Sequence, residues 1–331
     1  MSSVGIIANP ASGKDIRRLV ARASILDNNE KVNIVVRLLL ALEDAGVDEV
    51  LIMPDSFAIG CKALDQLARH KAIQEKVRVL EMRYSGEATD STRAAEGMRE
   101  LGVNCLITIG GDGTNRAVAK GCGDVPLLPL STGTNNVFPY WIDSTTAGLA
   151  AAAIATGVVP VEAATGRTKR LEILQDGEVW DIALVDAVVC DYAFVGARAV
   201  WEVERLRQVV QTCASPANIG LSAIGGCFES IGRHEPRGLH LVIGAGGRVV
   251  RAPIAPGLLA RVPVQTVERL DIGDEVPVQQ APALIAVDGE RELEVRRGSE
   301  VAIRLSAAGP RVVAVTKTLE LAARDGFFRV G

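Results

Sequence analysis

Leu-Ile-Thr-Ile-Gly-Gly-Asp-Gly-Thr-Asn-Arg, residues 106–116, joins a short apolar run to a glycine turn and then to a segment that we expect to be helical. Glycines let backbone N–H groups approach an anion closely, and a helix start adds further N–H groups and the positive end of its dipole. We therefore expect a phosphate-binding turn formed by Gly110, Gly111, Gly113 and Thr114. Asp112 would repel phosphate, so its carboxylate is better suited to handle a proton or a metal ion. The stretch is typical of a phosphoryl-transfer site, although similar glycines also mark ordinary strand-to-helix turns.

A second turn of the same kind follows the next expected strand, residues 127–130. It has the sequence Ser-Thr-Gly-Thr-Asn-Asn over residues 131–136. Adjacent strands of a parallel sheet place both turns at the same carboxyl edge, where open α/β sheets bind ligands. Thr134, Asn135 and Asn136 are therefore candidates for ligand contacts. The apolar and aromatic residues 137–141 come next, and they would form either a purine pocket or a lid over the domain junction.

The first part of the chain alternates between expected strands and helices. Apolar runs at 4–8, 50–53 and 77–82 indicate strands, whereas helical spacing recurs over 32–42, 58–68 and 91–101. This alternation predicts a parallel sheet covered by helices on both faces. An alanine-rich helix at 147–155 would link to the rest of the chain. We therefore expect an α/β nucleotide-binding domain at 1–146 and a mostly β domain at 147–331.

The texture of the second domain is β-rich. Turn residues separate its short apolar segments, as expected for a β-sandwich. The expected strands are 171–174, 179–185, 239–243, 249–254, 283–287, 301–305 and 312–315. Residues 197–211 have helical spacing and predict an inserted helix, and 319–324 predict a short terminal helix. The glycine-rich residues 244–247 lie between two expected strands and favour a hairpin turn over a phosphate loop.

Composition excludes several classes of function. The 331 residues are 48% hydrophobic and 4% aromatic and carry a formal net charge of −4, so we expect neither a nucleic-acid-binding nor a membrane-binding surface. The six cysteines and three histidines have no spacing typical of a metal site, and we expect no metal bound by protein side chains alone. The N-terminus has no signal-peptide pattern and no apolar run approaches membrane-spanning length. We expect a reduced, cytoplasmic protein that acts on small metabolites.

The two glycine turns resemble those of the superfamily that joins NAD kinases to diacylglycerol and sphingosine kinases, which share a Gly-Gly-Asp-Gly-Thr motif. Within it, the chain is most similar to the ATP-NAD kinase-like proteins of acetoin catabolism (AcoX-type). The similarity runs from Asn-Pro-Ala-Ser-Gly at 9–13, through both turns, to Val-Asp-Gly-Glu at 287–290. The resemblance implies a parallel-sheet ATP-binding domain, a β-sandwich substrate domain, ATP and Mg²⁺ as cofactors, and a homo-oligomer.

The resemblance also implies roles for individual residues near the nucleotide. In the lipid kinases a similar Asn-Pro-x-Ser-Gly stretch lies near nucleotide phosphates, which makes Asn9, Ser12 and Lys14 candidate ATP contacts. On the residues alone, the same stretch is equally consistent with a capped turn that carries solvated charges. Asp112 would be the catalytic residue, and Thr134 and Asn135 would contact the nucleotide.

On the substrate side, NAD kinases hold the dinucleotide with an Ala-Leu-Asn-Glu-Val-Val motif of the second domain. The matching stretch here, residues 183–188, is Ala-Leu-Val-Asp-Ala-Val. Asp186 can accept hydrogen bonds from a ribose, or it is an outward-facing strand residue, whereas the side chain of Val185 can neither donate nor accept. Asp288 and Glu290 belong to an Asp-Gly-Glu sequence like that of lipid kinases, and the alternative is an ordinary hairpin turn.

Three functions fit these residues. The first is ATP-dependent phosphorylation of the adenosine ribose 2′-hydroxyl of NAD, with substrate held by Asn136, Asp186, Asp288 and Glu290. The second keeps the same chemistry with another small-metabolite or lipid hydroxyl as acceptor. The third is nucleotide binding without transfer, which Val185 favours and Asp112 opposes.

Overall fold

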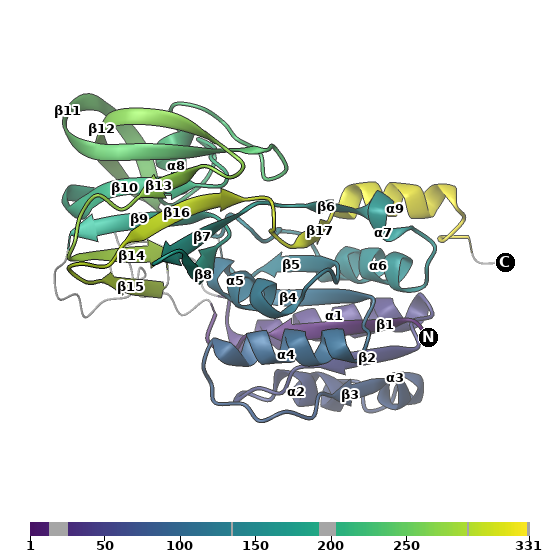
Figure 1. The fold of residues 1–331 in the computed structure, drawn as a ribbon. Coiled ribbons are helices and arrows are strands. Elements are labelled where there is room, and N and C mark those ends of the chain that lie inside the picture. The colour runs from purple at the N-terminus through teal and green to yellow at the C-terminus, as the bar shows by residue number, and fades with distance from the viewer. Residues whose placement is uncertain (13–25, 134, 192–202, 290, 330–331) are drawn as a thin grey trace.

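One open sheet forms the centre of the first domain. The computed structural model describes residues 1–12, 26–133, 135–191, 203–289 and 291–329, and it places seven of their strands in the order β3-β2-β1-β4-β5-β17-β6 (Figure 1). They are β1 (Ser3–Ala8), β2 (Glu49–Ile52), β3 (Val77–Val79), β4 (Cys105–Gly110), β5 (Leu127–Ser131), β17 (Arg311–Val313) and β6 (Thr165–Arg167). Neighbouring strands pair in parallel except β6, which runs antiparallel to β17. β1 and β4 are buried along their whole length because helices cover both faces of the sheet.

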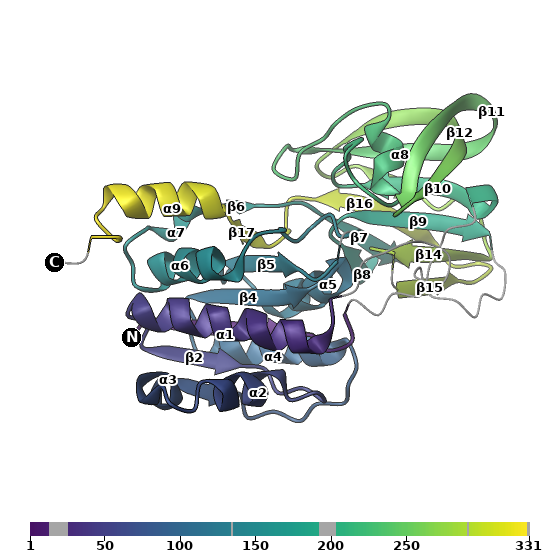
Figure 2. The same ribbon diagram turned by 180° about the vertical axis from the view of Figure 1, so that it is seen from behind.

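Helices lie on the two faces of this sheet, as the alternating sequence pattern predicts. One face is covered by α1 (Asn28–Asp44), α2 (Ile59–Gln66), α3 (Lys71–Lys76), α6 (Ser144–Ala155) and α9 (Val315–Arg324), and the other by α4 (Thr89–Glu100) and α5 (Asp112–Gly121) (Figure 2). The α1 helix begins after Asp27, whose side chain accepts a hydrogen bond from the Glu30 N–H, and it buries an apolar stripe that includes Val35 and Leu38. No helix in the described ranges is both long and apolar enough to cross a membrane.

The packing does not follow the domain boundary that the sequence predicts at residue 146. The predicted boundary falls inside α6, and the chain after this helix adds α7 (Val161–Ala164), β6, β17 and α9 to the first domain. The predicted terminal helix therefore lies on α6 and not in the β-rich domain. Because the last strand and helix return to the first sheet, the β-rich domain is an insertion between β6 and β17.

The second domain is built from two antiparallel sheets. Of the described strands, six follow the order β12-β11-β10-β9-β14-β15 and four the order β13-β16-β7-β8. Their bounds are β7 (Arg170–Gln175), β8 (Glu178–Ala183), β9 (Asp186–Asp191), β10 (Leu206–Gln211), β11 (Arg237–Ala255), β12 (Leu258–Asp271), β13 (Glu275–Pro277), β14 (Ala283–Val287), β15 (Arg291–Val295) and β16 (Val301–Ser306). Apolar residues of both sheets share one core, and the short helix α8 (Ser222–Gly226) packs on β11. The predicted fold class is confirmed: a parallel-sheet α/β domain with an antiparallel β-sandwich domain.

The helix predicted over residues 197–211 is wrong for the part that the structure describes. Val203–Arg205 forms one 3₁₀ turn and Leu206–Gln211 is strand β10, paired with β9 and β11; residues 197–202 lie outside the described residues. The strand is buried on both faces, so apolar and polar residues do not alternate along its sequence. The amide side chain of Gln208 donates to Pro277 O at 3.1 Å and that of Gln211 donates to Leu221 O at 2.8 Å, which lets both remain inside.

The glycine-rich residues 244–247 do not form the predicted hairpin turn. They lie within β11, where Ile243 and Arg248 both pair with Val264 and the residues between them form a bulge. A Cβ atom on Gly247 would come within 2.0 Å of Val264 O, so the bulge requires glycine there. The chain reverses instead near Gly257, which has a φ of +74°.

Lys169 lies between β6 and β7, where the chain crosses from the first sheet to the sandwich. Its side chain is buried and donates hydrogen bonds to Gly232 O at 3.0 Å and Arg237 O at 2.5 Å. Burial lowers the pKa of this ammonium group from 10.5 to about 8, and the charges of Cys213 and Glu235 oppose the shift. Lys169 therefore holds the 232–237 segment in place by two hydrogen bonds. Burial of its charge destabilises the native protein, and this effect depends on pH because only the protonated form is charged.

We expect this cost to disappear as the pH rises. Between pH 8 and 10.5 the unfolded chain binds the Lys169 proton and the native protein has released it, so stability increases with pH in that window. Relative to Lys169→Met, the wild type should gain up to about 3 kcal/mol from pH 8 to 10.5. Urea unfolding of both proteins across this range measures the difference, with Cys213→Ala in both because the Lys169 charge acts on the pKa of that thiol. If the free energies of unfolding of the two proteins change with pH in parallel, Lys169 is solvated in the native protein.

Candidate functional site

Three loops meet at the carboxyl edge of the parallel sheet. Gly110 at the end of β4 pairs with Ser131 at the end of β5, which brings the two glycine turns together as the sequence predicts. Asn9 follows β1 and its N–H donates to Ile109 O at 3.2 Å. The edge where ligands are expected in an open α/β sheet is therefore formed by these loops.

The glycines of the first turn are required by close packing. Gly111 precedes the first residue of α5, and a Cβ atom on it would lie 2.7 Å from the side-chain oxygen of Asn136. A Cβ atom on Gly110 would lie 2.5 Å from the Cβ atom of Thr114. Gly113 and Thr114 belong to the first turn of α5, whose N–H groups have no partner within the helix. The helix N-terminus thus offers N–H donors beside Asp112.

Asp112 is held firmly at the start of α5. It is 8% exposed, and both of its carboxylate oxygens accept a hydrogen bond from the Val137 N–H at 3.1 Å. Its Oδ1 also accepts from the Phe138 N–H at 2.8 Å. A carboxylate oxygen can accept more than one hydrogen bond, so this anchoring fixes the orientation of the group and leaves it able to accept from a ligand.

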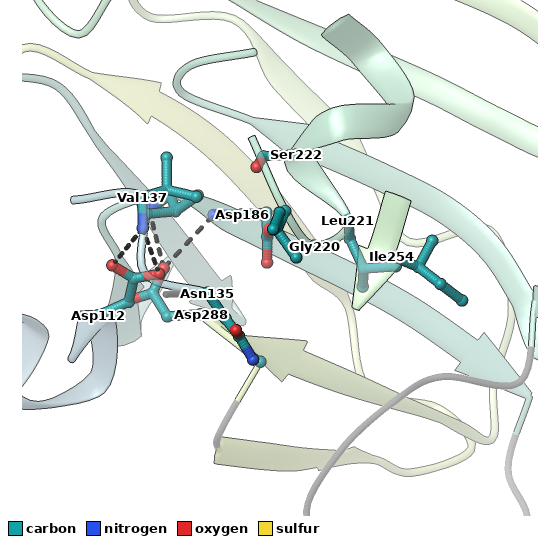
Figure 3. A pocket seen from close by; sticks show the side chains of 12 residues that line it. Asp112, Asn135, Val137, Asp186, Gly220, Leu221, Ser222, Ile254 and Asp288 are labelled. Atoms are coloured by element: carbon teal, nitrogen blue, oxygen red, sulfur yellow. Dashed lines mark hydrogen bonds between the residues drawn. The ribbon is translucent and has the colours of Figure 1, made fainter. Parts of the chain in front are cut away.

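A pocket lies in front of Asp112, between the two domains. The space in and in front of it, part of which is open solvent, amounts to about 440 Å³. Its wall is formed by Asp112, Asn135, Val137, Val185, Asp186, Ile219, Gly220, Leu221, Ser222, Ile254, Asp288 and Gly289 (Figure 3). Carboxylates and amides on one side face apolar side chains on the other. Such a combination suits a ligand with hydroxyl groups next to an apolar or aromatic part.

Asp288, which lines the pocket, lies in a turn between two strands. It and Gly289 have φ values of 51° and 68° and join β14 to β15, as the sequence alternative of a hairpin turn requires. The side chain accepts hydrogen bonds from the N–H groups of Leu184 at 3.0 Å and Val185 at 2.8 Å. Asp288 therefore fixes the strand connection that forms one wall of the pocket.

The charge of Asp288 faces an arginine of the first domain. The Arg116 Nε lies 3.7 Å from Asp288 Oδ2, and both side chains are more than nine-tenths buried. Burial raises the pKa of Asp288, whereas the Arg116 charge and the N–H donors oppose that rise. The Nε and Nη1 atoms of Arg116 have no hydrogen-bond partner within the described part of the chain. This pair joins α5 to the sandwich beneath the pocket.

Val185 and Asp186 both face the pocket. They are 2% and 7% exposed, so Asp186 is not the outward-facing surface residue that strand alternation allowed. The Thr212 hydroxyl donates to Leu184 O at 2.6 Å and braces the same connection. Because Val185 stands at the position where the related sequence motif has asparagine, the missing amide falls at the wall of the pocket.

The Asn9–Ser12 turn contacts both glycine turns without lining the pocket. The Asn9 side-chain amide donates to Thr114 Oγ1 at 2.9 Å, and the Thr132 hydroxyl donates to Ser12 Oγ at 3.3 Å. Sequence reasoning missed Lys31, which is fully buried and donates to Asn9 O and Ser12 O, each at 2.8 Å. Its place among the apolar residues on one face of α1 was the available signal. A buried cation therefore lies beneath this turn.

The remaining predicted residues differ in position. Asn135 lines the pocket, whereas the Asn136 side chain donates to Ser131 Oγ at 2.9 Å and Gly133 O at 3.3 Å and braces the second turn. Lys14, Thr134 and Glu290 lie outside the described residues. Among the residues that the structure does describe, no group of three or more His, Cys, Asp or Glu side chains is arranged to hold a metal ion. The pocket carboxylates fit Mg²⁺ only as one or two ligands alongside phosphate oxygens.

Comparison with known proteins shows the family to which the chain belongs. Residues 4–158 match the model of the ATP-NAD kinase N-terminal domain, and residues 169–308 match that of the acetoin catabolism protein X C-terminal domain. The crystal structure of yeast NADH kinase complexed with NADH has a similar fold, with a TM-score of 0.52 and 14% identity over 100% of this chain and 89% of that chain. Acetoin catabolism protein X of Cupriavidus necator is 42% identical over 336 residues, which is 98% of this chain and 94% of that protein. The predicted resemblance is therefore confirmed, and the chain belongs to the acetoin catabolism protein X family, with an N-terminal domain of the ATP-NAD kinase type.

Proposed function

We propose that this protein transfers the γ-phosphoryl group of ATP to a ligand hydroxyl, and that the 2′-hydroxyl of the adenosine ribose of NAD is the first acceptor to test. The products would be ADP, NADP and a proton. The observation that supports this most directly is the buried Asp112 carboxylate, held by two main-chain N–H groups at a helix N-terminus and facing an interdomain pocket. Phosphoryl transfer needs such positioning more than it needs covalent chemistry.

The positions of the groups support the following roles in the proposed transfer. Asp112 would orient the acceptor hydroxyl and accept its proton as the oxygen attacks the γ-phosphorus. The N–H groups at the start of α5 would stabilise the charge that develops on the phosphoryl oxygens. Mg²⁺, brought in with the triphosphate, would neutralise part of the phosphate charge when bound. Asn9, Ser12 and Lys31 would support the nucleotide side through the turn that they form.

The acceptor would lie against the second domain. Asp186 would accept hydrogen bonds from a ribose hydroxyl, because carboxylates are strong acceptors for adjacent hydroxyl groups. Asn135 adds an amide on the side of the first domain. Ile219, Leu221 and Ile254 form the apolar part of the wall and would contact a base or another flat group.

Val185 favours a second candidate, the phosphorylation of a hydroxyl group other than that of NAD. Its side chain faces the pocket and offers no hydrogen bond where the motif of the NAD kinases has asparagine. The loss of one such bond weakens binding by about 0.5–1.5 kcal/mol, which lowers affinity for NAD without preventing transfer. A smaller polyol would lose nothing at this position.

The test is an assay in which the purified protein, ATP and Mg²⁺ are incubated with NAD and both ADP and NADP are measured. We expect equal amounts of the two products and expect Val185→Asn to lower the KM for NAD about two- to tenfold. Val185→Ala is the matched control, because it shortens the side chain without adding an amide. If ADP forms only with other hydroxyl compounds, the second candidate holds. If nucleotide binds and no acceptor is phosphorylated, the proposal of a kinase is wrong.

A further inference from the structure

An arginine of the second domain covers the segment that holds Asp112. Arg233 precedes β11, and its guanidinium carbon lies 5.2 Å from the ring centroid of Phe138 and 4.8 Å from that of Tyr140. Its Nη2 donates to Phe138 O at 2.7 Å and Val137 O at 3.3 Å. The aromatic residues after the second glycine turn are therefore packed under a cation from the other domain.

The bonds of Arg233 and Asp112 meet on the same peptide group. The carbonyl of Val137 accepts from Arg233, and the N–H of Phe138, which belongs to that same peptide unit, donates to Asp112 Oδ1 at 2.8 Å. Hydrogen bonds in such a chain polarise one another, so the guanidinium charge strengthens the N–H that orients the carboxylate. The peptide is thus held from both ends.

The loop of Arg233 is itself anchored. Lys169 donates to the carbonyl of the preceding residue, Gly232, at 3.0 Å. The Nη1 atom of Arg233 is buried and has no hydrogen-bond partner among the residues that the structure describes. A buried donor that has no partner lowers the stability of the fold. The guanidinium group therefore keeps its stacking on Phe138 and Tyr140 and its bonds to two carbonyls although its buried Nη1 lowers local stability.

We propose that Arg233 is a positioning residue, which acts through the Val137–Phe138 peptide to keep the Asp112 carboxylate in its transfer geometry and makes catalysis depend on docking of the second domain. This inference rests on the proposed function. Arg233 touches neither the acceptor nor the phosphates in this scheme. Its loss lets the peptide rotate, and a catalytic group displaced by about 1 Å costs about 10²-fold in rate.

The test compares Arg233→Ala, Arg233→Lys and the control Arg269→Ala. Arg269 is an exposed arginine of the same domain whose contact is Glu229, away from the pocket. We expect Arg233→Ala to lower kcat about 10²-fold with the KM for ATP little changed. The lysine variant should regain little, because an ammonium group does not reproduce the planar, stacked guanidinium. Guanidinium ion, added below denaturing concentrations, should restore part of the activity of the alanine variant, and the control should behave like the wild type.

A second readout does not depend on activity. Amide hydrogen exchange at Phe138 should be faster in Arg233→Ala than in the wild type and unchanged in the control, with both variants folded by circular dichroism. Unchanged kcat in Arg233→Ala, or unchanged exchange at Phe138, would overturn the inference. If the wild type transfers phosphate to no acceptor while exchange at Phe138 is faster in the variant, the proposed function fails and Arg233 still positions the peptide.

Discussion

Asp112→Asn should lower kcat for phosphoryl transfer about 10²–10⁴-fold, the usual contribution of a positioned acid or base group. Asparagine has nearly the same shape and can still accept from the Phe138 N–H, so the turn should keep its structure. It cannot take the proton of the acceptor hydroxyl. The KM for ATP should change little, because in this proposal the phosphates contact main-chain N–H groups and not this carboxylate.

Steady-state kinetics with ATP and NAD, or with whichever acceptor the wild type uses, measure this effect. Asp65→Asn is the matched control, because Asp65 is an exposed residue of α2 and the change in charge is the same. Thermal unfolding shows whether Asp112→Asn is folded. A folded variant that transfers phosphate at the wild-type rate would remove Asp112 from the mechanism.

Asp288→Ala is expected to lower the free energy of unfolding by about 3–5 kcal/mol, because it removes one partner of a fully buried ion pair. The Arg116 charge would lose its counter-ion, and the N–H groups of Leu184 and Val185 would lose their acceptor. The wall of the pocket around Asp186 should loosen as well. Urea unfolding of the variant and wild type measures the loss.

A double variant separates the ion pair from the hydrogen bonds. Asp288→Asn preserves an oxygen that can accept the two N–H groups, and adding Arg116→Met removes the charge that would be left unpaired. Replacing a buried pair by uncharged groups of similar size is often close to neutral, so Arg116→Met with Asp288→Asn should be more stable than Asp288→Asn alone. Additive losses from the two substitutions would contradict an interaction between these side chains.

The pH dependence of stability should change in the same variants. Because burial raises the pKa of Asp288, the native protein holds this proton in a range above pH 3.8 where the unfolded chain has released it. The contribution of Asp288 to stability therefore falls as the pH rises from 3.8 through the raised pKa. Asp288→Asn should lack this fall, which unfolding experiments at several acidic pH values detect as a difference from the wild type.

Local sequence patterns determined much of the first domain. The apolar runs that form β1 and β4 are buried on both faces, and this is why they lack alternation and could be recognised as parallel strands. The two glycine turns were placed correctly at one sheet edge, because neighbouring parallel strands end on the same side. Asp112 was singled out as a carboxylate inside a glycine turn, and only the tertiary structure shows that it also holds the Val137 and Phe138 N–H groups.

The patterns failed where contacts distant in sequence override local preference. The 206–211 segment has helical spacing, yet its backbone groups pair with β9 and β11, and the amide N–H groups of Gln208 and Gln211 donate to the carbonyls of Pro277 and Leu221. The glycine-rich 244–247 segment resembles a turn, and only its pairing with Val264 shows that it is a bulge. Propensity is a weak guide in strands, since it mainly reflects packing against neighbours.

The sequence by itself thus determined the α/β domain, the β-rich second domain and the glycine turns, and it predicts Asp112 as the residue that handles a proton. The tertiary structure alone decided that β17 and α9 return to the first sheet and that Val185 faces the pocket. It also decided that Arg116 lies beside Asp288 and that Arg233 donates to the Phe138 carbonyl. The physical reason is the distance along the sequence over which each interaction acts. Helix, strand and turn preferences act over a few residues, whereas buried ion pairs and hydrogen bonds join residues about a hundred or more positions apart, and no local pattern specifies them.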